Sequence, residues 1–174
     1  QVARQKLVPT QLAAYGAYGF GQFSRLTTKG RVREYGESRL QELARQLGAE
    51  FAVEVAAPKA EGRSVIKAQI KYGGDLRYLC DVNRATLVCR DASALVKAAS
   101  KVAESFATEE ALLVELEDHY FSGSMSAGYR HVQALVRFCG VVWELQLNTP
   151  SMLAAKHAAG HKAYKTTRFV REMV

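Results

Sequence analysis

Two acidic residues, Asp81 and Glu144, occupy positions from which a carboxylate can take part in a reaction. Glu144 and Gln146 alternate with apolar residues in a segment typical of a strand, so their side chains share one face. A carboxylate and an amide inside otherwise apolar sequence cost free energy if they are buried without partners. They are therefore expected to line an open cleft or to belong to a hydrogen-bonded network.

Asp81 stands directly before a second apolar strand. Hard divalent cations bind proteins through one or two carboxylates together with substrate phosphates. Asp81 and Glu144 facing each other across a cleft are thus a reasonable pair of Mg²⁺ ligands. The residues alone leave open a surface ion pair between Asp81 and Arg84, and an ordinary solvent-exposed strand face at Glu144.

Basic side chains form two helical stripes. Arg63, Lys67 and Lys71 recur every four residues, which places three positive charges on one side of a helix. Such a stripe can follow the phosphates of a triphosphate, although a solvated helix face fits the same spacing. The second stripe lies near the end of the chain and consists of His157, His161, Lys165 and Arg168.

Tyr129 and Arg130 follow a Gly- and Ser-rich stretch. An aromatic ring next to a guanidinium group can stack on a base and contact a phosphate, although a tyrosine that opens a strand can equally pack on the core. Gln133 lies on the strand that follows, on a common face with Arg137. That strand and the strand of Glu144 are predicted to pair as a hairpin, which gives the sheet one dry face and one polar face.

These residues need a scaffold of alternating helices and strands. Apolar periodicity, Gly and Pro positions and capping residues predict the order α-β-α-β-α-β-β-β-α, which is an α/β fold with a mixed sheet flanked by helices. The expected helices span about 33–47, about 63–72, about fifteen residues after Asp91, and a segment that begins at Thr149-Pro150; the expected strands are 51–55, 85–89, 112–116, 131–138 and 141–147.

The length of 174 residues suits one domain, and we expect residues 33–174 to form it, preceded by an arm at 1–32. The net charge of +7 favours an anionic partner such as nucleotide phosphates or RNA. The three cysteines lack metal-ligand spacing and are expected to be free thiols. No apolar run is long enough to span a membrane.

Three motifs occur in an order that resembles the synthetase domain of the RelA/SpoT family. They are Gly128-Tyr129-Arg130, then Glu144 to Thr149 (Glu-Leu-Gln-Leu-Asn-Thr), then His161 to Lys165 (His-Lys-Ala-Tyr-Lys). Asp81 before its apolar strand resembles the metal-binding Asp of that family, and the stripe from Arg63 to Lys71 resembles its ATP-binding helix. The resemblance covers about residues 35–168 and implies the nucleotidyltransferase-like synthetase fold.

The resemblance also implies a reaction, in which a pyrophosphate group moves from ATP to the 3′-hydroxyl of a purine nucleotide. Asp81 and Glu144 would hold Mg²⁺, and Glu144 would take the proton of the hydroxyl. The resemblance further implies a set of residues that bind ATP and the acceptor nucleotide. They are Arg63, Lys67, Lys71, Arg84, Tyr129, Arg130, Gln133, Gln146, His161 and Lys165.

Several positions depart from the family pattern. Thr86 replaces an Arg, Gln133 replaces a His, Asn148 replaces an Arg, and Lys156 lies where a Glu is common. Because most of these positions contact nucleotides in the family that the chain resembles, two alternatives remain open: transfer to the 3′ end of a tRNA, and a nucleotide-binding module without catalysis. The expected setting is the cytoplasm, or a target cytoplasm into which the chain is delivered as a toxin.

Overall fold

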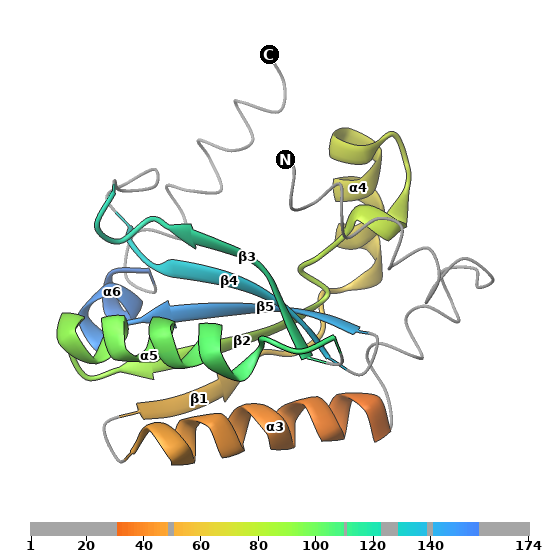
Figure 1. Ribbon diagram of the computed structural model, residues 1–174. Coiled ribbons are helices and arrows are strands. Elements are labelled where there is room, and N and C mark those ends of the chain that lie inside the picture. Colours follow the sequence, from red (N-terminus) through yellow and green to blue (C-terminus); the bar gives the residue numbers. More distant parts are fainter. Residues whose placement is uncertain (1–30, 49–50, 110, 123–128, 139–140, 157–174) are drawn as a thin grey trace.

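The computed structural model describes residues 31–48, 51–109, 111–122, 129–138 and 141–156 (Figure 1). Within these residues the elements follow the predicted order, with one short 3-10 helix added. Their bounds are α3 (Arg31–Leu47), β1 (Phe51–Val55), α4 (Glu61–Tyr72), η1 (Leu76–Tyr78), β2 (Asn83–Cys89), α5 (Ala92–Ser105), β3 (Ala111–Asp118), β4 (Val132–Phe138), β5 (Val141–Asn148) and α6 (Pro150–Ala155).

The five strands form one mixed sheet in the order β1-β2-β5-β4-β3. β2 and β5 are parallel, and the other neighbouring pairs are antiparallel. The predicted hairpin of β4 and β5 is confirmed, and so is the mixed sheet. The parallel pair places β2, far away in the sequence, directly beside the strand that carries Glu144.

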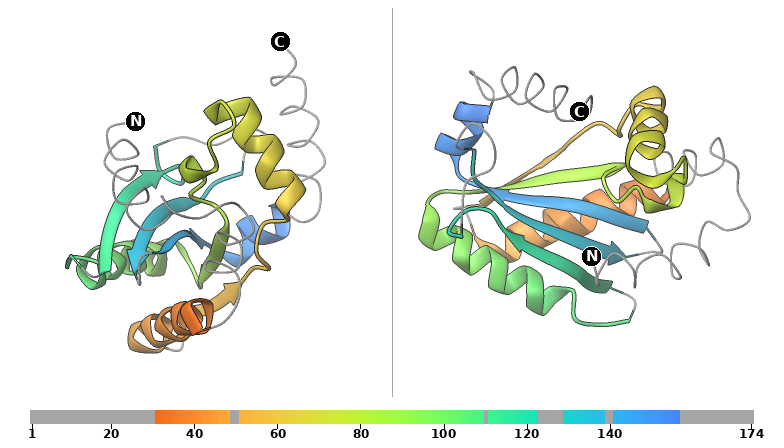
Figure 2. Two further views of the ribbon diagram at one scale, coloured as in Figure 1. Left: turned by 90° about the vertical axis from the view of Figure 1, so that its right-hand side faces the viewer. Right: turned by 90° about the horizontal axis from the view of Figure 1, so that it is seen from above.

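Of the helices that the structure describes, two lie along one face of the sheet and two lie near the ends of the other. Figure 1 shows α3 and α5 on the same side of the sheet, while α4 stands over one end of the opposite side and α6 lies near the other end. The main core lies between the sheet and the pair α3 and α5. Figure 2 shows these two helices and the sheet from two further directions. Its largest fully buried side chains include Trp143, Leu145 and Leu147, the predicted dry face of β5.

Local signals in the sequence fix several ends of these helices. The carboxylate of Asp91 accepts a hydrogen bond of 2.9 Å from the backbone N–H of Ala94, which caps α5 as predicted. Gly73 ends α4 with a φ of 60°, a left-handed conformation that glycine adopts without strain. Thr149 precedes Pro150 at the start of α6. Cys80 and Cys89 are free thiols as expected, and Cys139 lies outside the described residues.

Gly36 on α3 allows the helix to approach the indole of Trp143. A Cβ atom at this position would lie 2.5 Å from the Trp143 ring, closer than carbon atoms approach one another. We expect Gly36→Ala to destabilise the fold by about 1–3 kcal/mol, because overpacking outweighs the gain in helix propensity of roughly 1 kcal/mol. Urea denaturation measures the change.

Gly62→Ala on α4 is the matched control for this substitution. The added Cβ at Gly62 meets nothing within 4 Å, so the same change should leave the stability equal or slightly raised. If Gly36→Ala were as stable as the original chain, the close packing of α3 on Trp143 would be contradicted.

Candidate active site

The open face of the sheet gathers the polar residues of three adjacent strands. In the parallel pair, Arg84 of β2 lies opposite Glu144 of β5, and Thr86 lies opposite Gln146. On the other side of β5, Gln133 of β4 lies opposite Gln146. The strand register therefore confirms the predicted polar face and centres it on Glu144 and Gln146.

Asp81 lies at one end of this face, between η1 and β2, and is held by two lysines. Its Oδ2 atom accepts from Lys59 Nζ at 2.5 Å and from Lys67 Nζ at 2.7 Å, and all three side chains are largely buried. Burial by itself would raise the pKa of Asp81, but the ammonium groups of Lys67 and Lys59 together hold it below its ordinary value. Asp81 is therefore ionised at neutral pH. Among the described residues, nothing hydrogen-bonds to its other oxygen, Oδ1, which is buried.

Glu144 has the opposite environment. Burial raises the pKa of its carboxyl group, and the negative charge of Asp81 raises it further, against the opposing effect of a hydrogen bond from Gln146. Two acids whose environments push their pKa values apart are typical of sites in which one binds a cation and the other exchanges a proton.

A second polar group surrounds Gln146 at the end of β5. Gln146 Nε2 donates to Glu144 Oε1 at 2.7 Å, and Lys156 Nζ donates to Gln146 Oε1 at 3.0 Å. The same ammonium lies 5.4 Å above the ring of Tyr129, whose hydroxyl accepts from Asn148 Nδ2 at 2.5 Å. Burial raises the pKa of Tyr129 to about 12, so the phenol stays protonated. Hydrogen bonds and the ammonium of Lys156 thus connect Glu144 through Gln146 to the aromatic ring of Tyr129.

His131 extends this group into the protein. Its side chain is 2% exposed, and its ring lies 5.1 Å from that of Tyr129 and 5.5 Å from that of His119. Burial lowers the pKa of His131 to about 4, and the charges of Lys156 and Glu117 act on it in opposite directions. The imidazole is therefore neutral in the folded protein at neutral pH.

The burial of a neutral imidazole at His131 predicts that the folded protein loses stability in mild acid. The unfolded chain binds a proton at His131 with a pKa near 6.5, whereas the folded chain binds it only near 4, so the contribution to stability falls as the pH falls through this range. From pH 7 to pH 5 we expect His131 to account for about 2 kcal/mol of lost stability. His131→Phe, which keeps an aromatic ring in place, should lose less stability over the same interval in urea denaturation; equal losses would contradict the buried neutral imidazole.

The other residues predicted for the site have varied positions. Arg63 and Lys71 are exposed on α4, so of that stripe Lys67 reaches Asp81. Arg84 Nη2 donates to the carbonyl of Ala57 at 3.2 Å, whereas the ion pairs of Asp81 are with Lys59 and Lys67. Arg130 donates to the carbonyl of Tyr120, and Gln133 donates to Glu117. His161 and Lys165 lie outside the described residues.

Sequence reasoning missed Lys59 as a residue of the site. Lys59 lies between β1 and α4, 22 residues before Asp81, in a segment without periodicity. Its backbone N–H donates to the carbonyl of Val82, and this bond fixes the segment beside Asp81. Pro58 and Gly62 indicated only a loop, so no signal in the sequence identified Lys59.

The described residues contain no group of three or more His, Cys, Asp or Glu side chains placed to hold a metal ion by themselves. None of the described helices is long and apolar enough to cross a membrane.

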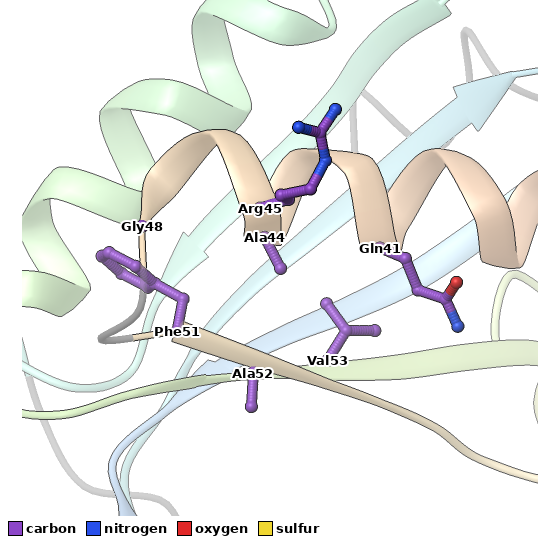
Figure 3. A pocket seen from close by; sticks show the side chains of 7 residues that line it. All are labelled: Gln41, Ala44, Arg45, Gly48, Phe51, Ala52 and Val53. Carbon is purple, nitrogen blue, oxygen red and sulfur yellow. The ribbon is translucent and has the colours of Figure 1, made fainter.

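A separate pocket lies between α3 and β1 (Figure 3). Gln41, Ala44 and Arg45 line it from the helix, and Phe51 and Val53 line it from the strand. It shares no residue with the polar face around Glu144, and Arg45 forms an ion pair with Glu42. This pocket adds no group to the candidate site.

No protein-family model matches the sequence, and comparison with the curated proteins finds no significant match. Solved structures do match the fold. Small alarmone synthetase 1 from Bacillus subtilis, bound to its product pppGpp, superposes with a TM-score of 0.67 at 16% identity over 84% of this chain and 82% of that chain. A GTP pyrophosphokinase family protein from Streptococcus pneumoniae gives 0.63 at 14% identity over 83% and 79%.

A third similar structure is the complex between the type VI effector Tas1 and its immunity protein. It gives a TM-score of 0.50 at 20% identity over 85% of this chain and 62% of that chain. Identities this low establish shared architecture and leave the chemistry to the residues themselves. The fold of this chain is that of the small alarmone synthetases, the RelA/SpoT-type synthetase fold that the sequence motifs resemble.

Proposed function

We propose that this chain transfers a pyrophosphate group from ATP to the 3′-hydroxyl of a purine nucleotide. The observation that carries the proposal is the pair of coupled carboxylates on the open face of this fold, with Asp81 ionised between two lysines and Glu144 raised in pKa. Sites that move phosphoryl groups work mainly by positioning the reactants and by neutralising charge. The two carboxylates and the two lysines are groups that can do this here.

Asp81 and Glu144 fit Mg²⁺. The buried Oδ1 of Asp81 accepts no hydrogen bond from the described residues, and the negative charge of Asp81 acts on the Glu144 carboxyl group. Mg²⁺ characteristically takes one or two carboxylates and completes its shell with phosphate oxygens and water. When bound, the ion neutralises charge that develops on the transferred phosphates.

Lys59 and Lys67 form the donor side of the proposed site. Both ammonium groups are desolvated and aimed at Asp81, so the phosphates of ATP placed next to this carboxylate would meet two positive charges. The exposed Arg63 and Lys71 continue the positive charge along α4. We assign the β- and γ-phosphates of ATP to this side.

Glu144 and Tyr129 form the acceptor side. Glu144 accepts the proton of the 3′-hydroxyl, the 3′-oxygen forms a bond to the β-phosphorus of ATP, and the bond from that phosphorus to the oxygen of the α-phosphate breaks, releasing AMP. Tyr129 offers a ring for the acceptor base, and Arg84, Arg130, Gln133, Gln146, His161 and Lys165 are the proposed polar contacts. Asn148 hydrogen-bonds Tyr129 and the backbone of Thr149, so it supports the ring where the family pattern has an Arg.

The test is a transfer assay with ATP labelled in its γ-phosphate, Mg²⁺ and GDP, GTP, ADP, AMP or bulk tRNA as separate acceptors. Labelled product that forms together with an equal amount of AMP supports the proposal and identifies the acceptor. Transfer to tRNA alone would replace the nucleotide by an RNA acceptor. A folded chain that binds ATP and transfers to none of these acceptors would indicate a nucleotide-binding module instead.

A further inference from the structure

A hydrogen-bonded chain links α6 to the proposed catalytic carboxylate. Lys156 Nζ donates to Gln146 Oε1 at 3.0 Å, and Gln146 Nε2 donates to Glu144 Oε1 at 2.7 Å. Lys156 is half-buried and directly follows α6, which begins at Pro150 just beyond β5. The turn from β5 into α6 therefore brings Lys156 back over a residue ten positions earlier in the chain.

The hydrogen-bonding chemistry of Lys156, Gln146 and Glu144 permits only one orientation of the Gln146 side-chain amide. A glutamine amide presents oxygen on one side and NH₂ on the other, and the two orientations are nearly equal in shape. An ammonium group only donates hydrogen bonds, so the oxygen of Gln146 must face Lys156. The NH₂ group then faces Glu144, whose ionised carboxylate only accepts.

We propose that Lys156 is a positioning residue, which fixes the amide of Gln146 so that its NH₂ group holds the Glu144 carboxylate in place for the reaction. The inference rests on the proposed function for the role of Glu144, and on the hydrogen bonds alone for the orientation of Gln146. Lys156 also contacts the ring of Tyr129, so the same ammonium spans the acceptor and catalytic parts of the site.

Three substitutions separate positioning from a general structural role. Lys156→Met removes the donor and keeps most of the volume, Lys156→Arg keeps a donor, and Lys156→Glu offers an acceptor that favours the reversed amide. We expect kcat to fall by about 10–100-fold in Lys156→Met, which is typical of losing a group that orients a catalytic ligand. The KM for ATP should change less than about twofold. Lys156→Arg should recover most of kcat, and Lys156→Glu should be at least as impaired as Lys156→Met.

Gln146 supplies the decisive cross-check. In a Gln146→Met background, Lys156→Met should cause little further loss, because the group through which Lys156 acts is already gone. Lys101→Met on α5, where the lysine is exposed and pairs with Glu104, is the control and should leave kcat unchanged. Losses that multiply in the double variant, or a Lys156→Arg variant as impaired as Lys156→Met, would overturn the inference.

The side-chain amide of Gln146 gives a readout that needs no turnover. In ¹⁵N-resolved NMR spectra assigned with Gln146→Met, the NH₂ resonances of Gln146 should shift in Lys156→Met and Lys156→Glu, and stay near their original position in Lys156→Arg. Unchanged resonances in Lys156→Met would refute the positioning role even if the chain proved inactive. Inactivity with the expected shifts would refute the proposed function and leave the orientation of the amide established.

Discussion

Glu144→Gln is expected to reduce pyrophosphate transfer by about 10³-fold, within the 10²–10⁴ range typical of losing a positioned acid or base. An amide has nearly the shape of a carboxylate and can still accept the hydrogen bond from Gln146, but it neither takes a proton nor offers Mg²⁺ a negative charge. Turnover with the best acceptor, measured with ATP at saturation, reports this loss.

The stability of this variant is the second part of the prediction. Burial raises the pKa of Glu144, which means that the fold carries the cost of a desolvated carboxylate at neutral pH. Removing the charge should therefore leave the melting temperature equal or higher. Glu104→Gln on α5 makes the same chemical change at an exposed residue of the opposite layer. It should alter neither the rate of pyrophosphate transfer nor the melting temperature. Full activity in Glu144→Gln would exclude Glu144 from the chemistry.

Asp81→Asn is expected to damage both activity and stability. Lys59 and Lys67 lose their shared counter-charge while their side chains stay 12% and 17% exposed, and removing one partner of a buried ion pair typically costs about 3–5 kcal/mol. Burial already lowers the pKa of Lys59, so this lysine can release its proton in the variant and recover part of the cost. Transfer should fall by about 10²-fold or more, because a carboxylate ligand for Mg²⁺ is lost.

A double-variant cycle separates the two effects. Lys59→Met in the Asp81→Asn background should restore stability, because it removes an uncompensated buried charge, whereas in the original chain it should be destabilising. Activity should not return in the double variant, since the metal ligand is still missing. If Lys59→Met had the same effect on stability in both backgrounds, the ion pair between Lys59 and Asp81 would make no contribution to folding.

The local structure around the site was predictable because it depends on short-range patterns. The alternation in β5 placed Glu144 and Gln146 on one face, and the apolar periodicity of α3 and α5 identified the helices that cover the other face. The Asp91 cap and the Gly73 terminus followed from backbone chemistry. These features need only the residue types and the periods of strands and helices, so the predicted order of elements was confirmed with bounds that differ by one or two residues.

The partners of the two proposed catalytic carboxylates depended on the tertiary structure. The sequence placed Arg84 near Asp81, but the parallel pairing of β2 with β5 sets Arg84 opposite Glu144, and Asp81 instead pairs with Lys59 and Lys67. The tertiary structure also made Lys156 a partner of Gln146. Contacts between residues distant in the sequence follow from how strands pair and how helices turn back over the sheet. The sequence by itself therefore determined that Glu144 and Gln146 share a face, and the packing of the sheet decided which charges surround them, because no short-range pattern records a long-range contact.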